Sequence, residues 1–188
     1  VTRMVDAKGV ADLLRAVSEP ALRSEVTLRL VGDGPDLGEF KQLGQRLNVS
    51  VEFLGWGDAE AVHRVLQWSE IAAMPSRSSK LNTEQWGRSA VEAMLTGRAV
   101  LASDSGELPN LIANSALIHQ QGNWQSLAQR ILWVLEHRSS LGELGGAAWQ
   151  RAQEFTPESL APRMIAFWEA AIACAQGSNR SNEGRLTH

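Results

Sequence analysis

Two carboxylate side chains, Glu84 and Glu92, lie eight positions apart on either side of a Trp-Gly turn and a short apolar run, in the stretch EQWGRSAVE. Paired carboxylates can exchange protons with a substrate as general acid and base, or accept hydrogen bonds from ligand hydroxyl groups. Spacing alone does not select a role, because Glu52 and Glu60 have the same separation. Ser89 and Glu92 also match a helix capping box, and Glu84 could be a solvated loop acid. The sequence leaves a ligand role and a structural role open for both glutamates.

The backbone between these glutamates has the features of an anion-binding segment. Gly87 allows the chain to approach a ligand closely, and a helical pattern over residues 89–95 begins directly after Arg88. The amides of this segment are expected to point beyond the end of the preceding strand. Helix N-termini of this kind favour phosphate groups, so we expect a phosphate-bearing ligand here.

Two cations, Arg3 and Lys8, lie five positions apart in the stretch RMVDAKG, ahead of a helix expected to begin near Gly9. A guanidinium binds oxygens in pairs and an ammonium supplies a mobile charge, so together they suit a diphosphate. Solvated surface cations are the alternative. The later stretch VGDGP has neither the glycines of a dinucleotide fingerprint nor the lysine of a Walker loop, and we interpret it as an ordinary strand-to-helix loop.

Strand-like and helix-like patterns alternate along the first two thirds of the chain. Apolar or alternating stretches predict strands in VTLRLVG, VSVEFLG, EIAAMP, RAVLAS and NSALIH, and helical spacing follows the first three of them. Asp58 is expected to cap the second of these helices. Alternation of this kind predicts an α/β fold with a Rossmann-like, doubly wound parallel sheet, which binds ligands beyond the carboxyl ends of its strands.

The domain organisation is predicted from the places where the alternation of strands and helices starts and stops. After Asn123 the sequence is helical, and residues 176–188 are polar and rich in Gly, Ser and Asn. We expect one domain over residues 1–175 and a disordered tail over residues 176–188. The opening stretch VTRMVDAKG is interpreted as the end of a strand followed by a loop, with most of the strand missing.

Composition narrows the class of protein. The 188 residues are 44% hydrophobic, which is enough for one substantial core. The formal net charge is −3, so the chain lacks the excess of basic residues that attracts nucleic acid. The single Cys174 excludes a disulfide scaffold, and no apolar run approaches the ~20 residues of a membrane span. The four histidines are scattered and no carboxylates have metal-ligand spacing, so we expect neither a metal nor another cofactor.

Taken in order, the stretches TRMVDAKGV, LRLVGDGP, VEFLGW, AAMPSR, EQWGRSAVEAML and VLASDSGELP resemble the C-terminal donor-binding domain of the retaining group 1 glycosyltransferases. The similarity covers about residues 1 to 120, and the order and spacing of the stretches carry it. The resemblance implies one half of a GT-B fold, which grips a nucleotide-sugar between its two halves. It also implies a role in polysaccharide or glycolipid biosynthesis.

The resemblance implies a role for each candidate residue. Arg3 and Lys8 would hold the donor diphosphate, and Glu84 would face the sugar hydroxyls. The donor-binding set would be the amides of Gly87 and Arg88 at the sugar or phosphate, Glu92 at the ribose, and Phe53 and Leu54 near the base. Gln85 departs from the family pattern, which has a small residue there, and this could crowd the sugar pocket or select a different sugar.

The implied reaction is retaining transfer of a hexosyl group from a nucleoside-diphosphate sugar to a hydroxyl acceptor. The expected partners are this donor and the N-terminal acceptor domain, which is absent, so the chain alone is expected to be inactive and could self-associate. We expect a cytoplasmic protein that a part outside this chain could attach to a membrane. Two alternatives stay open: a non-catalytic nucleotide-sugar binding or interaction module and, ranked lower, a sugar-nucleotide epimerase.

Overall fold

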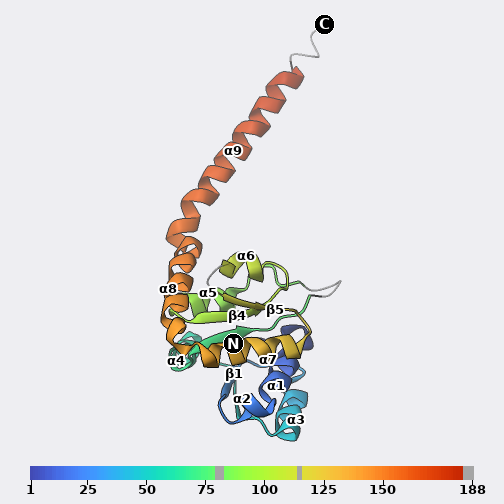
Figure 1. Ribbon diagram of the computed structural model, residues 1–188. Coiled ribbons are helices and arrows are strands. Elements are labelled where there is room, and N and C mark those ends of the chain that lie inside the picture. The colour runs from blue at the N-terminus through green and yellow to red at the C-terminus, as the bar shows by residue number, and fades with distance from the viewer. Residues whose placement is uncertain (79–82, 114–115, 184–188) are drawn as a thin grey trace. The chain divides into compact units, whose positions relative to one another are not determined.

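The computed structural model describes residues 1–78, 83–113 and 116–183 (Figure 1). The chain divides into two compact units, Val1–Arg151 and Ala152–His188. All strands and the candidate site lie in the first unit, which is described first.

Five parallel strands form the centre of the first unit. β1 (Leu28–Val31) pairs with β2 (Val51–Gly55), while β4 (Ala99–Ser103) lies between β3 (Ile71–Met74) and β5 (Ala116–His119). The predicted α/β fold with parallel strands is therefore confirmed. The strands form two separate sheets, however, because no hydrogen-bonded pairing joins β1 to β3 in the described part of the chain.

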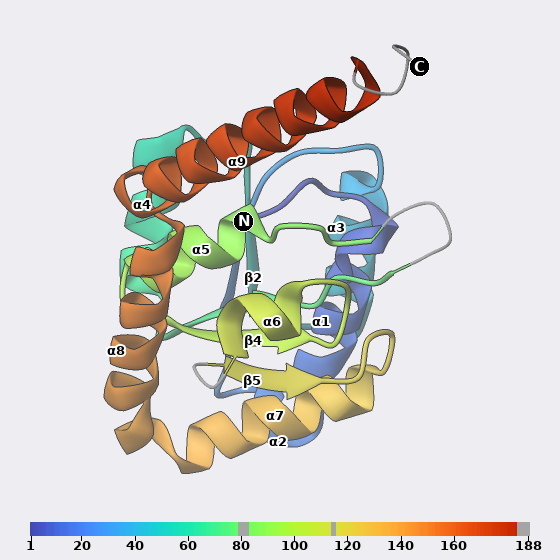
Figure 2. The same ribbon diagram turned by 90° about the horizontal axis from the view of Figure 1, so that it is seen from above.

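Helices cover the strands on both faces, with α5 and α6 on one side of β4 and α7 on the other (Figures 1 and 2). Asp58 caps α4 as predicted, since its carboxylate accepts a hydrogen bond from the Ala61 amide at 2.8 Å. The helices of this unit are α1 (Val10–Val17), α2 (Pro20–Arg23), α3 (Leu37–Leu47), α4 (Ala59–Trp68), α5 (Arg88–Leu95), α6 (Leu108–Ile112), α7 (Trp124–Glu136) and α8 (Leu141–Ala152), with short 3-10 turns η1 (Asp6–Lys8) and η3 (Arg138–Ser140).

The core lies between the sheets and the helix layer of α1, α3 and α7. Leu14, Leu22 and Leu127 are completely buried there, and each such side chain contributes roughly 1.5–3 kcal/mol. β4 is buried along its whole length, as expected of a strand covered on both faces. This core holds the carboxyl ends of the strands in place, and those ends carry the candidate site.

The second unit consists of η4 (Gln153–Phe155) and the helix α9 (Pro157–Glu183). Helix therefore covers residues 176–183, for which disorder was predicted, while residues 184–188 lie outside the described residues. The predicted domain boundary at residue 175 stays a prediction. In the described part of the chain, no helix combines the length and the apolar character that crossing a membrane requires.

Candidate functional site

A cavity of about 860 Å³ lies beyond the carboxyl ends of β1 and β2, between α4 and α5. In parallel α/β sheets this is the end at which ligands bind. Five segments supply its walls: the first three residues, the end of β1, the loop from β2 into α4, α4 itself, and α5. Side chains with polar or aromatic groups in the lining include Arg3, Asp33, Trp56, His63, Arg88 and Glu92.

Next to this cavity, three hydrogen-bond donors converge on the carboxylate of Glu84. Its Oε2 atom forms an ion pair with Lys8 Nζ and accepts a hydrogen bond from Ser76 Oγ at 3.2 Å. Its Oε1 atom accepts a hydrogen bond from the Gly87 amide at 3.2 Å. Lys8 and Gly87, predicted to bind one anion, thus bind the same carboxylate.

The electrostatics of Glu84 follow from these contacts. Burial by itself raises the pKa of the Glu84 carboxyl. The hydrogen bond and charge of Lys8, followed by the Gly87 amide and the Ser76 hydroxyl, outweigh this effect, so the pKa lies below its ordinary value. Glu84 is therefore an anion at neutral pH, and the surrounding groups form a site that stabilises negative charge.

Two glycines allow the backbone to reach this arrangement. Gly9 has φ 68°, and a Cβ atom there would lie 1.8 Å from the carbonyl oxygen of Pro75, so only glycine lets the Lys8 turn lie against the end of β3. Gly87 has φ 63°, and its Cβ would lie 2.9 Å from side-chain atoms of Leu108 and Leu111 in α6. The Lys8 turn and the Gly87 amide therefore both reach their positions because a glycine leaves no Cβ atom in a tight contact.

The loop that carries Glu84 is fixed by the loop that follows β4. The Glu107 amide donates a hydrogen bond to the Glu84 carbonyl oxygen at 2.9 Å. Gly106 has φ 54°, and a Cβ atom there would lie 2.2 Å from that same oxygen. Two neighbouring strand ends thus cooperate to place one carboxylate.

Arg77 anchors the segment that carries Lys8, a role that the sequence did not predict. Its Nε atom donates to Asp12 Oδ2 at 2.7 Å, and its second contact to that carboxylate makes the pair bidentate. The Arg77 amide donates to the Ala7 carbonyl oxygen at 2.8 Å, and Nη1 lies 3.5 Å from Asp6 Oδ1. The hydrogen bond to Asp12 raises the pKa of Arg77. The only sequence signal was an acid, Asp12, within an apolar helical pattern.

The structure excludes one of the roles considered for Glu92. Gly87 occupies the N-cap position of α5, and no side chain caps this helix. The capping-box alternative is therefore wrong, because the left-handed Gly87 starts the helix two residues earlier than Ser89 would. The Glu92 side chain is exposed and lines the cavity together with Arg3 and Arg88.

Phe53 and Leu54, expected near the base of the ligand, are not among the residues that line the cavity. Phe53 packs against the core and Leu54 is 47% exposed. The chain reaches the cavity two residues later, at Trp56, which is 77% exposed. Within residues 1–78, 83–113 and 116–183, no group of three or more metal-ligating side chains could hold a metal ion. The ligand roles of the named residues stay predictions.

The parallel α/β architecture and an anion site at the carboxyl ends of its strands define the class of this protein. The family model of the glycosyl transferases group 1 matches residues 1–151, and the chain belongs to this family. The architecture is that of the C-terminal half of a GT-B glycosyltransferase, so the resemblance found in the sequence is confirmed.

Individual relatives agree with this assignment. The chain is 30% identical over 175 residues to an MMP alpha-(1->4)-mannosyltransferase of Mycolicibacterium hassiacum, matching 90% of this chain and 41% of the relative. The Anabaena protein Alr3699/HepE in complex with UDP superposes with a TM-score of 0.79 at 25% identity, over 90% of this chain and 47% of that one. Sucrose-phosphate synthase of Thermosynechococcus elongatus gives a TM-score of 0.79 at 26% identity, over 93% and 45%.

The chain spans about two fifths of the length of the curated relatives that it matches, 41% of the mannosyltransferase and 40% of a D-inositol 3-phosphate glycosyltransferase of Corynebacterium kroppenstedtii.

Proposed function

We propose that this chain binds the nucleoside-diphosphate sugar of a retaining hexosyltransferase, which transfers the glycosyl group to a hydroxyl acceptor. The observation that carries the proposal is the convergence of Lys8 Nζ and the Gly87 amide on a single carboxylate, that of Glu84. A cation and a helix N-terminal amide that already hold one anion are suited to hold a phosphate group.

In the proposed complex, the donor diphosphate takes the contacts that Glu84 now makes with Lys8 and Gly87. Arg3, which lines the adjoining cavity, supplies a second positive charge. When the bond from the sugar to the diphosphate breaks, negative charge grows on the leaving diphosphate, and these preplaced groups stabilise that charge. The acceptor oxygen forms the new bond to the sugar with retained configuration, and its proton passes to the leaving diphosphate oxygen. Glu84, released from Lys8, is then available to the sugar hydroxyls.

The remaining cavity suits the nucleoside. The exposed Glu92 carboxylate can accept hydrogen bonds from both ribose hydroxyls, and Trp56 offers an aromatic face on which a base can stack. The UDP complex of the structurally similar Anabaena protein supports a nucleotide as the ligand. These contacts position the donor and leave the chemistry to the diphosphate site.

Titration calorimetry of the chain with UDP-, GDP- and ADP-glucose tests the proposal. We expect binding of at least one donor, and Lys8→Met is expected to weaken it by about 10-fold, because a charged hydrogen bond is lost. Lys41→Met is the matched control, since Lys41 is exposed on α3 and should leave affinity unchanged. Equal affinities of the two variants, or no binding of any donor, would contradict the diphosphate site.

Transfer is tested in a complete two-domain enzyme that contains this chain. There, Lys8→Ala should lower turnover by roughly 100-fold, as expected for loss of one charge-stabilising group. Nucleotide-sugar binding without transfer by the unsubstituted complete protein would favour the non-catalytic binding module instead.

A further inference from the structure

Two buried serine hydroxyls form a chain of hydrogen bonds that leads from the end of β4 to Glu84. Ser103 Oγ donates to the Ser76 carbonyl oxygen at 2.6 Å, and Ser76 Oγ donates to Glu84 Oε2 at 3.2 Å. Ser103 is completely buried and Ser76 is 6% exposed. Neither serine is among the residues that line the cavity of about 860 Å³ beside Glu84. The two hydroxyls therefore contact the Glu84 segment from the interior of the protein and not from the ligand side.

The end of β3 explains why a side chain replaces the backbone at this point. The hydrogen-bonded pairing of β3 with β4 ends at Met74. Pro75 follows and has no amide hydrogen with which to extend the pairing. Ser103 lies opposite this position, and its backbone is held by pairing with β5. Its hydroxyl therefore reaches the next carbonyl oxygen, that of Ser76, from a fixed point.

The peptide group between Ser76 and Arg77 is held on both sides. Its carbonyl oxygen accepts the hydrogen bond from Ser103, and its amide donates to the Ala7 carbonyl oxygen at 2.8 Å. Ala7 directly precedes Lys8. One peptide group thus joins β4 to the turn that carries the cation, and the Ser76 side chain extends from a backbone of fixed orientation.

The Ser76 hydroxyl differs from the other two donors to the Glu84 carboxylate. In the proposed donor complex, Lys8 and the Gly87 amide turn to the diphosphate. Of the three donors that the structure describes, Ser76 is then the one that stays with Glu84. Because Ser76 is buried, it cannot follow the other two to the ligand. A carboxylate that keeps one fixed hydrogen bond keeps its direction, as precise placement against a substrate requires.

We propose that Ser76 and Ser103 are positioning residues of the sugar site. Ser76 directs the Glu84 carboxylate towards the sugar while the diphosphate occupies Lys8 and Gly87. Ser103 sets the orientation of Ser76. This inference rests on the proposed function, since it assigns the two serines to the same donor site. Both serines act through Glu84 without touching the donor, so their effect is expected in turnover and not in donor affinity.

Carboxyl NMR of the ligand-free chain, labelled with carbon-13 glutamate, tests the hydrogen bond itself. Burial raises the pKa of the Glu84 carboxyl, and the Ser76 hydroxyl is one of the donors that lower it. Ser76→Ala should therefore raise the pKa of Glu84, whose signal is assigned with Glu84→Gln. Ser103→Ala should raise this pKa less, because the Ser76 hydroxyl remains but is no longer aligned. An unchanged pKa in Ser76→Ala would refute the inference.

Steady-state kinetics of the complete two-domain enzyme test the positioning role. Ser76→Ala should lower kcat by at least about 10-fold, because the Glu84 carboxylate loses its direction in the donor complex. The KM for the donor should change by less than about 2-fold, because Ser76 does not contact it. Ser103→Ala should lower kcat by about 3-fold or more, as expected for loss of one neutral hydrogen bond. A higher KM at unchanged kcat would make Ser76 a donor-binding residue and contradict the inference.

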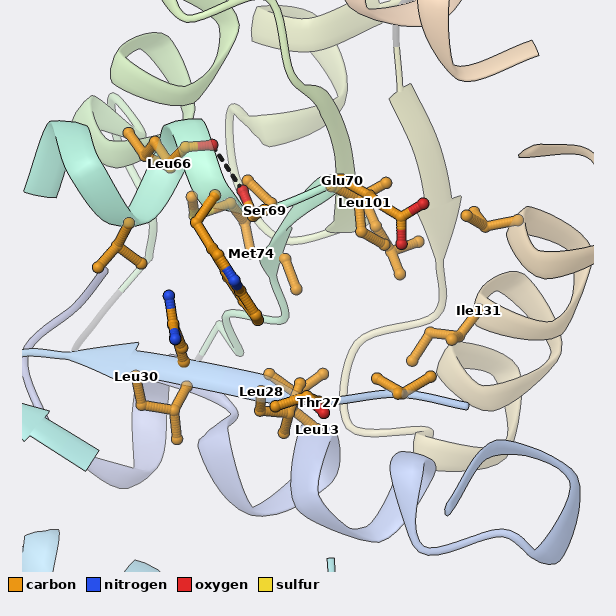
Figure 3. A pocket seen from close by; sticks show the side chains of 18 of the residues that line it. Leu13, Thr27, Leu28, Leu30, Leu66, Ser69, Glu70, Met74, Leu101 and Ile131 are labelled. Carbon is orange, nitrogen blue, oxygen red and sulfur yellow. Dashed lines mark hydrogen bonds between the residues drawn. The ribbon is translucent and has the colours of Figure 1, made fainter. Parts of the chain in front are cut away.

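The matched control is Ser69→Ala. The Ser69 hydroxyl also donates to a backbone carbonyl oxygen, that of Leu66 at 2.9 Å, but it lies at the opposite end of β3 (Figure 3). Ser69 lines a different cavity, of about 340 Å³. Its replacement should leave kcat, KM and the pKa of Glu84 unchanged. A decrease in kcat as large as that of Ser76→Ala would assign both effects to lost stability and refute the positioning role.

Failure of this inference can be distinguished from failure of the proposed function. If no donor binds in the calorimetric titrations, the diphosphate site is refuted, and the inference that rests on it falls too. If donors bind and Lys8→Met weakens them, but Ser76→Ala retains full kcat, the diphosphate site stands and the positioning role is refuted. Should Ser76→Ala not fold, Ser103→Ala undergoes both measurements, and an unchanged kcat with an unchanged pKa of Glu84 would equally refute it.

Discussion

Replacing Arg77 by methionine tests how the cation-bearing segment is held in place. Asp12 lies on α1 with its side chain only 2% exposed, and Arg77 supplies its two short contacts. Arg77→Met retains most of the side-chain volume but removes the charge. The Asp12 carboxylate would then keep only Arg15, whose Nη1 atom lies 3.6 Å away.

The expected loss of stability can be worked from these contacts. Removing one partner of a buried ion pair costs about 3–5 kcal/mol, because the other charge stays desolvated. The Arg77 side chain is 29% exposed and Arg15 remains nearby, so the loss should lie at or just below the lower end of this range. We expect a decrease of about 2–3 kcal/mol in the free energy of unfolding, or about 4–12 °C in melting temperature for a chain of this size.

Urea denaturation followed by circular dichroism measures this difference. The matched control is Arg64→Met, because Arg64 and Glu60 form an ion pair with side chains 62% and 78% exposed. An exposed pair of this type contributes no more than about 0.5 kcal/mol. Combining Arg77→Met with Asp12→Leu should restore most of the lost stability, since no charge is then left buried. Equal losses for Arg77→Met and Arg64→Met would refute the anchoring role.

Three further predictions concern the same region and its surroundings. Gly9→Ala should lower the free energy of unfolding by at least about 2 kcal/mol, because the positive φ and the contact with Pro75 exclude a Cβ atom. Gly38→Ala in α3 is the control, since a Cβ atom there meets open space, and it should be neutral or stabilising. Urea denaturation of both variants measures the difference. Near and below the ordinary pKa of 4.5, the Glu84 carboxyl binds more protons in the unfolded state than in the folded state. Its contribution to stability is therefore complete above pH 4.5 and disappears as the pH falls through the lower pKa of the folded state. Lys8→Met should reduce this loss of stability with pH in denaturation curves measured at several pH values. Burial lowers the pKa of His119 from 6.5, so stability should also fall as the pH drops below 6.5, and His119→Gln should flatten that part of the curve.

The sequence was sufficient to predict the strands, because strands depend on local patterns. Alternation identified β1 and β2, and Gly87 lies in the loop that follows β3, as predicted. Lys8 lies in η1, ahead of the first strand that the structure describes. Capping by Asp58 could be predicted because donor and acceptor are three positions apart. Helix α5 was placed too late, because the left-handed conformation of Gly87 took the cap position that Ser89 was expected to fill.

Long-range pairings could not be predicted in this way. Arg77 and Asp12 are separated by 65 positions, and Lys8 and Glu84 by 76, so no local spacing links them. The same limit explains why the residues expected near the base of the ligand do not line the cavity. Alternation along β2 turns Phe53 into the core, and Trp56 reaches the cavity only because the chain leaves the strand at Gly55. Strand patterns likewise predict β1 and β3 but not that they lie in separate sheets among the described residues, because pairing depends on which edges meet.

The contacts of Glu84 change how the proposed diphosphate site should be understood. Lys8 and the Gly87 amide already bind a carboxylate of lowered pKa, that of Glu84, so a ligand must displace this carboxylate to reach them. In the proposed complex, donor binding exchanges one anion for another, so affinity reflects only the difference between the two. The exchange keeps the cation and the amide in one place before the donor arrives, so little reorganisation remains when charge develops on the leaving group. It also frees the Glu84 carboxylate at the moment the sugar is present. In the proposed complex, positioning of the diphosphate and release of the Glu84 carboxylate are therefore two results of the same displacement.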